Sequence, residues 1–150
     1  MALFKKKEFF SDEEKQAIVE AVQQAEQRTS GEIRVFVEHR CRYVNAIDRA
    51  VEIFENLQMY KTQLRNAVVV YVAVKDRQLA IFGDEGIHQK VGNEYWANEV
   101  VKMINAFNRE NIAAGIAQCV ANIGEALCTH FPYDKNTDKN ELPDDIVFGR

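Results

Sequence analysis

Residues 65–86, RNAVVVYVAVKDRQLAIFGDEG, decide how this chain folds. Their first part, residues 67–74, is an unbroken apolar run rich in β-branched side chains, which is typical of a strand buried on both faces. Residues 75–77 then turn the chain, and residues 78–82 resume as a second strand. Because only about three residues connect the two strands, this stretch predicts an antiparallel hairpin.

Four helices and one further strand are predicted around the hairpin. Ser11 and Glu14 match a capping box at the start of the first helix, and Asn45 can cap the second. Residues 32–38, EIRVFVE, alternate like a strand with one strongly apolar face. The helices are recognised by apolar residues at helical spacing, and they cover residues 11–28, 45–57, 93–107 and 111–131.

The strand at residues 32–38, the second helix and the strand at residues 67–74 form a β-α-β unit. Such a connection is right-handed, places the two strands parallel and packs the helix on the sheet. We therefore expect an α/β fold, a three-layer α/β/α sandwich with a short mixed central sheet and four main helices. The helices of residues 11–28 and 45–57 are expected to flank the sheet, and the helices of residues 93–107 and 111–131 are expected to cover its other side. Residues 1–131 are predicted to form this single domain. Residues 132–150 are an acidic tail, with Ile146, Val147 and Phe148 as a candidate docking segment.

Composition narrows the classes of function. The 150 residues include 19 basic and 23 acidic side chains, and no basic face indicates a nucleic-acid partner. The start lacks the apolar core of a secretory signal, and no run of about 18 apolar residues predicts membrane insertion. Three cysteines, an odd number, fit reduced thiols better than a disulfide framework. These features predict a cytoplasmic protein.

Residues 83–86, Gly-Asp-Glu-Gly, are predicted to form a tight acidic loop after the hairpin. Because the hairpin reverses the chain, this loop returns to the sheet edge at which the strand of residues 67–74 begins. The strand of residues 32–38 is parallel to that strand, so it starts at the same edge. The side chains expected to converge there are those of Glu32, Arg65, Asn66, Asp84 and Glu85.

These segments resemble the TPM domain family, a domain shared by thylakoid lumen proteins, a photosystem II repair protein and a modulator of acetylcholine receptors. The resemblance covers residues 11–131 and is carried by TSGEIRVFVE at residues 29–38, by residues 65–86 and by the helices that follow. The ending FPYDKNTDKNELPDDI is most similar to the small soluble bacterial members. Residues 83–86 depart from a family loop that is GxGLEG-like, and Asn66-Ala67 stands where many relatives have Asn-Gly.

The resemblance implies calcium or another divalent cation near the loop after the hairpin, and the acid phosphatase activity claimed for some plant members. In this chain the hard oxygen ligands that Ca²⁺ and Mg²⁺ prefer would come from Glu32, Asn66, Asp84 and Glu85. The other interpretation is that Asp84 and Glu85 form a solvated turn and that Glu32 pairs with Arg65.

A second oxygen-rich pattern lies in the tail. Asp134, Asn136 and Asp138 occupy the first, third and fifth positions of an EF-hand-like loop, with Asp145 at the twelfth. Lys139 stands where such a loop needs glycine, and the twelfth ligand is not Glu. An ordinary polar tail is therefore the preferred interpretation.

Two functions stay open at this stage. The leading hypothesis, drawn mainly from the resemblance, is a non-enzymatic module that binds calcium or magnesium and contacts a protein partner. The alternative is a metal-dependent phosphatase that acts on phosphate monoesters, with the cation activating water and Arg65 binding the anion. The sequence contains neither a P-loop nor a GxGxxG spacing, and no catalytic residue is assigned.

Overall fold

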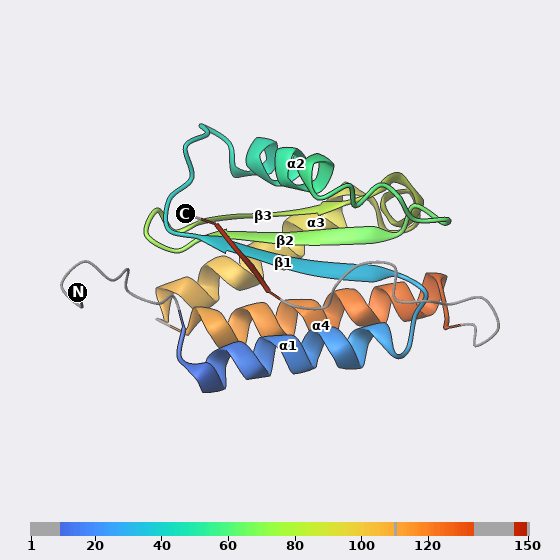
Figure 1. Cartoon of the computed structure of the whole chain (residues 1–150), viewed down its shortest axis with the longest axis horizontal. Coiled ribbons are helices and arrows are strands. Elements are labelled where there is room, and N and C mark those ends of the chain that lie inside the picture. The colour runs from blue at the N-terminus through green and yellow to red at the C-terminus, as the bar shows by residue number, and fades with distance from the viewer. Residues whose placement is uncertain (1–9, 110, 134–145, 150) are drawn as a thin grey trace.

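The computed structural model describes residues 10–109, 111–133 and 146–149. The predicted helices and strands are present in the predicted order, and a short strand follows them near the C-terminus (Figure 1). In chain order they are α1 (Asp12–Glu26), β1 (Glu32–Glu38), α2 (Ala46–Asn56), β2 (Ala67–Ala73), β3 (Gln78–Gly83), α3 (Glu85–Asn108), α4 (Ile112–His130) and β4 (Val147–Phe148).

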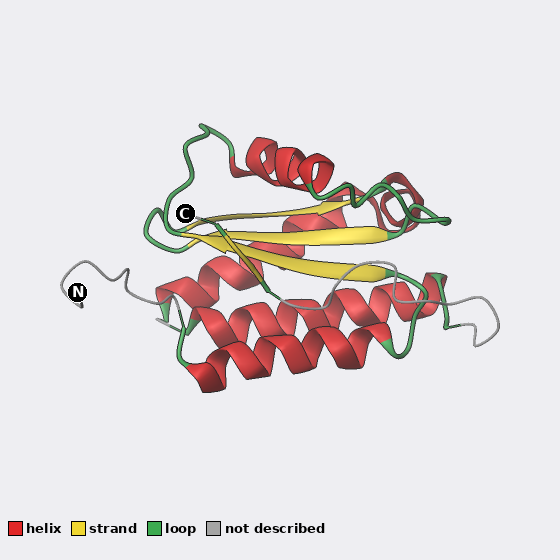
Figure 2. Ribbon diagram, in the orientation of Figure 1, coloured by secondary structure: helices red, strands yellow, loops and turns green. Residues whose placement is uncertain are grey.

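The sheet is mixed, as expected, with the strand order β3-β2-β1-β4 (Figure 2). Strand β1 is parallel to β2, with Glu32 opposite Ala67. Strand β3 is antiparallel to β2, with Val68 opposite Gly83. The predicted hairpin and the parallel β-α-β unit are both confirmed, and β2 lies between the two strands that flank it.

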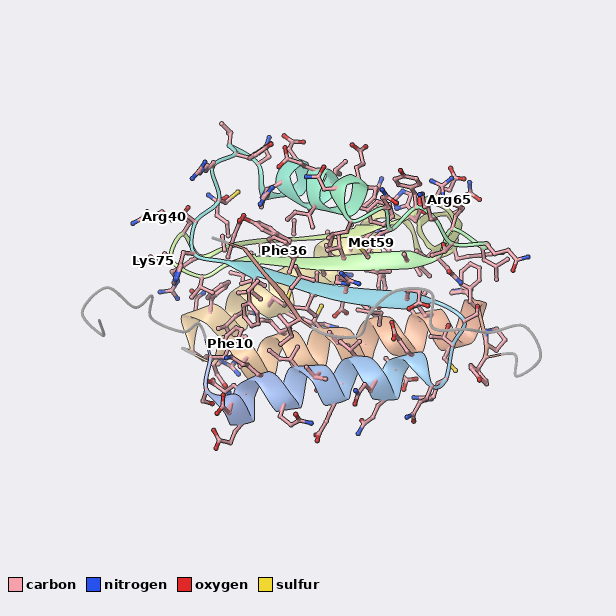
Figure 3. All side chains as sticks on the ribbon, viewed as in Figure 1. Phe10, Phe36, Arg40, Met59, Arg65 and Lys75 are labelled. Carbon is pink, nitrogen blue, oxygen red and sulfur yellow. The ribbon has the colours of Figure 1, made fainter. Side chains whose placement is uncertain are left out.

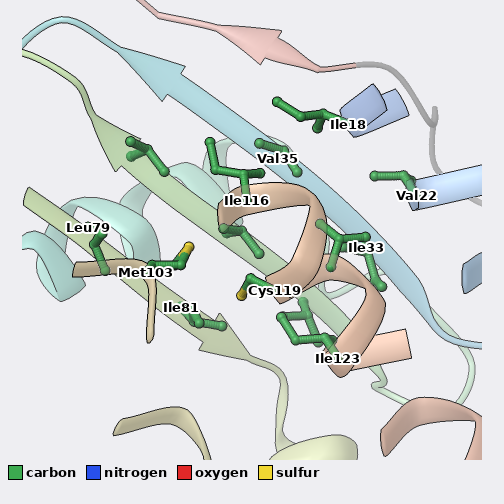
Figure 4. Packing of buried hydrophobic residues seen from close by; sticks show 14 of the residues in the cluster. Ile18, Val22, Ile33, Val35, Leu79, Ile81, Met103, Ile116, Cys119 and Ile123 are labelled. Carbon is green, nitrogen blue, oxygen red and sulfur yellow. The ribbon is translucent and has the colours of Figure 1, made fainter. Parts of the chain in front are cut away.

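Helices cover both faces of the sheet, so the predicted three-layer sandwich is confirmed (Figure 1). The predicted position of the first helix is wrong, because α1 packs with α3 and α4 and not on the face that α2 covers. Val68, Val70 and Val72 face the larger core, to which α1, α3 and α4 contribute. The alternate side chains of β2 face the smaller core, to which α2 contributes. Figure 4 shows the larger core, in which Ile33 and Val35 of β1 lie beside residues of α1 and α4.

The structure corrects the prediction for residues 83–86, which do not form a separate loop. Gly83 ends β3, Asp84 is the N-cap of α3, and Glu85 and Gly86 lie in its first turn. Two glycines around two acidic residues resemble a turn when only local sequence is considered. Here the second glycine serves a close contact between segments, described below, and the aspartate begins a helix.

Helix α3 therefore begins before Asn93, the start that the sequence indicated. Its interior is broken at Gly92, which has φ 81° and ψ 171°, and the predicted helix corresponds to the part after this break. The capping box of α1 is confirmed, because Ser11 and Glu14 bond to each other's backbone N–H. Asn45 is the N-cap of α2, but its side chain makes no capping hydrogen bond.

Both ends of the C-terminal region are attached to the domain. Tyr133 donates its N–H to the Arg28 carbonyl, at 3.2 Å. Val147 and Phe148 pair with β1 as β4, and Ile146 is buried. The EF-hand-like residues lie within residues 134–145, outside the described part of the chain, and the predicted domain boundary at residue 131 stays a prediction.

Helix α4 is, among the described residues, the one helix with the length and apolar composition of a membrane span. Its apolar residues have a different explanation in this fold. Ile116, Val120, Ile123 and Leu127 are all fully buried in the larger core, against α1, α3 and the sheet. A core helix of a globular domain accounts for this composition.

Gly124 allows α4 to approach α1 closely, because a Cβ at this position would lie 2.6 Å from the Ala25 Cβ. We predict that Gly124→Ala lowers the free energy of unfolding, since overpacking of about 1–3 kcal/mol outweighs the gain in helix propensity. In an Ala25→Gly background the same substitution should instead stabilise the protein, by up to about 1 kcal/mol. Urea unfolding of the four proteins measures both effects, and equal effects in the two backgrounds would contradict the contact.

Candidate functional site

The sheet register brings the predicted site residues together at one end of the strands, where β1 and β2 begin and β3 ends. Glu32 is opposite Ala67 on one side, and Asp84 donates its N–H to the Ala67 carbonyl on the other, at 2.9 Å. The predicted convergence at this edge is therefore confirmed. We call this group the Asp84 corner, and its members are Glu32, Arg65, Asn66, Asp84 and Glu85.

Glu32 and Asp84 lie on the same face of the sheet. Ile33 faces the larger core and Phe82 packs against the smaller one, so by alternation both acidic side chains are on the α2 side. The small Ala67 separates them, and two strand spacings place their backbones about 10 Å apart. Ala67 is itself fully buried in the smaller core, so the two acidic residues flank a packed position of that core.

The Asp84 side chain is buried, and both of its carboxylate oxygens accept hydrogen bonds. Its Oδ2 accepts a hydrogen bond from Arg65 Nε at 2.6 Å, and its Oδ1 accepts from Arg65 Nη2 at 2.9 Å and from the Glu85 N–H at 2.8 Å. Its side chain is 5% exposed, against 43% for Arg65. Asp84 is thus both the helix cap and the partner of a bidentate ion pair, so the interpretation as a solvated turn is wrong for this residue.

Arg65 is surrounded by negative charge. Besides Asp84, the carboxylate of Glu85 lies 3.3 Å from Arg65 Nη1. The hydrogen bonds that Arg65 donates to Asp84 are the main cause that raises the pKa of the Arg65 guanidinium above its ordinary value. The positive group at this corner is therefore held by two carboxylates of the α3 N-terminus.

The backbone of Arg65 has an unusual conformation, with φ of 51°, in the left-handed region that few non-glycine residues adopt. It is held there by the start of α3, because Gly86 donates its N–H to the Arg65 carbonyl at 2.8 Å. A Cβ on residue 86 would lie 2.6 Å from that oxygen. Glycine at residue 86 is thus explained by this close approach between two backbones.

The other members of the corner are buried polar residues. Asn66 donates from its amide to Ser30 Oγ at 3.2 Å, and its carbonyl accepts the Glu32 N–H at 3.4 Å. Thr62 Oγ1 is buried as well, and it has no hydrogen-bond partner within the described residues. Asn66 and Asp84 are thus buried polar residues with hydrogen-bond partners, as burial of polar groups requires.

The donor types at the corner suit a cation. No cluster of three Asp, Glu, His or Cys side chains is arranged as a metal site in the parts of the chain that are described. The corner nevertheless already holds a positive group, the guanidinium of Arg65, between the carboxylates of Asp84 and Glu85. The two carboxylates are thus neutralised by an arginine of the chain itself.

Sequence reasoning missed an ion pair at the opposite end of the strands, where β1 ends. Arg49 of α2 donates to Glu38 Oε2 at 2.9 Å and to Oε1 at 3.0 Å, and the Tyr71 hydroxyl also donates to Glu38. Burial, together with this hydrogen bond, raises the pKa of Tyr71 well above its ordinary value. The only sequence signal was a set of polar residues in otherwise apolar elements. The cluster joins α2 to the sheet.

Comparisons with known proteins agree on the fold. The family model described as TPM domain matches residues 3–126. The solution structure of the BA42 protein from the psychrophilic bacterium Bizionia argentinensis is similar, with TM-score 0.86 and 39% identity over 99% of this chain and 100% of that one.

A more distant likeness shows the fold alone. The N-terminal domain of cg2496 from Corynebacterium glutamicum has TM-score 0.57 and 16% identity, over 79% of this chain and 74% of that one. No curated protein matches the chain.

The two roles of Asp84 can be separated by substitution. Asparagine is as good an N-cap as aspartate but carries no charge, whereas alanine lacks the cap as well. We predict that both variants are less stable than the wild type, because each loses the pair with Arg65. The free energy of unfolding of Asp84→Ala, measured with urea, should be lower than that of Asp84→Asn by about 1 kcal/mol. Equal stabilities of the two variants would show that the cap contributes nothing.

Proposed function

The chain belongs to the TPM domain family, and from this premise we propose that it is a non-enzymatic module that binds a divalent cation, calcium or magnesium, and contacts a protein partner in the cytoplasm. The observation that carries the proposal is the positive group already held by two carboxylates at the Asp84 corner. A bound cation would supply positive charge at the corner, and it would take no part in a reaction of a substrate.

The residues that would hold the cation are those whose oxygens gather at the corner. Asp84 and Glu85 contribute carboxylates from the start of α3, and their negative charge has to outweigh the positive partial charge of the helix N–H groups there. Glu32 and Asn66 contribute a further carboxylate and an amide oxygen from the edge of the sheet. Oxygen donors of mixed carboxylate and amide type are those that Ca²⁺ and Mg²⁺ take in proteins.

A surface suited to a protein partner lies beside the corner. Residues 57–66, which connect α2 to β2 and are called the α2–β2 segment below, include Tyr60 and Leu64. These side chains are 40% and 51% exposed, and Leu64 directly precedes Arg65. Exposed aromatic and aliphatic side chains next to a charged group are common features of protein interfaces.

The alternative function, hydrolysis of phosphate monoesters, would use Arg65 to hold the phosphate. An anion would have to replace Asp84 and Glu85 as the partners of the guanidinium, and both are tied to the first turn of α3. No contact within the described part of the chain favours this arrangement, so the non-enzymatic function is the one we adopt.

Calorimetric titration with CaCl₂ and MgCl₂ tests cation binding. We predict binding by the wild type and a loss of affinity of at least about tenfold in Asp84→Asn, because a charged ligand is removed while the helix cap is kept. Asp76→Asn is the matched control, since Asp76 also pairs with an arginine, Arg40 at 3.1 Å, but at the hairpin turn. Absence of binding heat in all three proteins would refute the proposal.

The same proteins test the alternative. We predict that phosphate release from a generic phosphate monoester stays at the buffer rate, with or without calcium or magnesium, because Arg65 is engaged by two carboxylates. Phosphate assays with wild type, Asp84→Asn and Arg65→Gln provide the measurement. Hydrolysis by the wild type that disappears in both variants would replace the proposed function with the phosphatase.

A further inference from the structure

Two connections meet at the end of the molecule opposite the Asp84 corner. They are the β1–α2 connection, residues 39–45, and the hairpin turn, residues 74–77. The Arg40 guanidinium pairs with Asp76 of the turn at 3.1 Å, which joins the two connections. Figure 3 places Arg40 and Lys75 at this end of the molecule and Arg65 at the other. The two connections therefore form one continuous surface.

The exposed charged side chains of these two connections are all basic. They are those of Arg40, Arg42, Lys75 and Arg77, and we call this group the basic end. The side chain of Asp76 is only 23% exposed and is already engaged by Arg40. The chain as a whole has a net charge of −4 at pH 7, so its positive charge is locally concentrated here. Because its members come from two connections, the sequence alone does not reveal this group.

Exposed apolar side chains project beside the basic end. Tyr43 and Val44 directly follow Arg42, and Ile47 lies in the first turn of α2. These three side chains, called the apolar tip below, are 36%, 94% and 42% exposed. Figure 1 shows the β1–α2 connection rising beyond the sheet on the side of α2. A side chain that is 94% exposed has almost no protein atoms around it, so Val44 stands on a convex surface and does not line a groove.

The apolar tip is held in position from both sides. The Tyr43 hydroxyl donates a hydrogen bond to the Glu52 carboxylate of α2. Before the tip, the Cys41 N–H donates to Asp76 Oδ2 at 2.8 Å, and α2 begins shortly after Val44. These contacts fix the backbone on which Val44 is presented. Little conformational entropy would therefore be lost when the tip enters an apolar environment.

We propose that the basic end and the apolar tip form a docking surface for an anionic lipid bilayer. The arginine and lysine side chains lie at the level of the lipid phosphates, and their positive charge complements that of the lipid surface. Val44 and the Tyr43 ring enter the boundary between headgroups and acyl chains, where aromatic and aliphatic side chains are favoured. The contact is peripheral and needs no helix that crosses the bilayer.

The convex shape of the apolar tip favours a bilayer over other anionic partners. Lipids surround a projecting apolar side chain, whereas an acidic protein would need a cavity that matches the tip. A nucleic acid would satisfy the basic end but offers no apolar phase for Val44, which is 94% exposed. This inference goes beyond the proposed function and does not depend on a cation at the Asp84 corner.

Co-sedimentation with vesicles, in buffer with EDTA, tests the proposal with the full chain. Phosphatidylcholine vesicles are compared with vesicles in which about one-third of the lipid is phosphatidylglycerol, which supplies the anionic surface. The wild type should bind only the anionic vesicles. Raising NaCl from about 0.05 M to about 0.5 M should weaken this binding, because salt screens the charges. Equal binding to both kinds of vesicle, or binding to neither, would overturn the inference.

Charge variants locate the surface. Arg42→Gln and Lys75→Gln should each lower partition into anionic vesicles about fivefold, because each removes one basic side chain from the lipid surface. Lys61→Gln is the matched control, since Lys61 is equally exposed but belongs to the α2–β2 segment at the other end. Its partition should equal that of the wild type. An equal loss in all three variants would show that net charge alone governs binding, and the inference would fail.

Val44→Ser tests the apolar tip without a change of charge. Its partition should fall about tenfold, because the burial of a valine side chain is lost. Leu64→Ser is the matched control, since Leu64 is an aliphatic side chain that is 51% exposed at the other end of the molecule. It should bind vesicles like the wild type. Both variants should unfold in urea like the wild type, so a loss of binding cannot arise from misfolding.

Fluorescence anisotropy with labelled polyglutamate and a labelled single-stranded oligonucleotide examines the other anionic partners. The wild type should bind both polymers more weakly than it binds anionic vesicles. If either polymer binds as tightly as the vesicles, and Val44→Ser binds it like the wild type, the surface recognises anionic polymers. That result would overturn the assignment to lipid.

Discussion

Burial of β2 on both faces is the constraint on which the rest of the structure depends. Each residue from Ala67 to Ala73 is completely removed from solvent. Its backbone polar groups can then be satisfied only by neighbouring strands, and β1 and β3 provide them on the two sides. Its side chains need a layer on each face, which α2 provides on one side and α1, α3 and α4 on the other.

The position of β2 also determines what meets at its two ends. At its start, the parallel β1 and the returning β3 bring Glu32 and Asp84 to the flanks of Ala67. Asp84 is buried there, and a buried carboxylate needs a charged or hydrogen-bonding partner. Arg65 supplies it from the residues that lead into the same strand. The site is thus a consequence of how the central strand begins.

Arginine–carboxylate pairs lie at both ends of the strands, and the pair of Arg49 with Glu38 differs in attachment from the pair of Arg65 with Asp84. Glu38 and Arg49 belong to β1 and α2, and Tyr71 of β2 completes the group, so all its members are in regular elements inside the fold. Arg65 instead lies in a segment without helix or strand, and its side chain is more exposed than that of Arg49. The first pair therefore connects regular elements of the fold, whereas the second connects a segment without regular structure to the start of α3.

The sequence by itself determined the three long strands, the hairpin and the parallel unit, because apolar periodicity and connection length are local properties of the chain. The face of the sheet that α1 covers was decided by tertiary packing against α4. It also indicated the edge at which Arg65 and Asp84 meet, since chain reversal follows from a short turn. Only the tertiary structure decided that Gly86 is a contact point and that Asp84 begins a helix. Both depend on the approach of the Arg65 backbone from a separate segment. The pair between Glu38 and Arg49 was not predicted either. A contact between residues of two different elements does not change the periodic pattern of residues in either element.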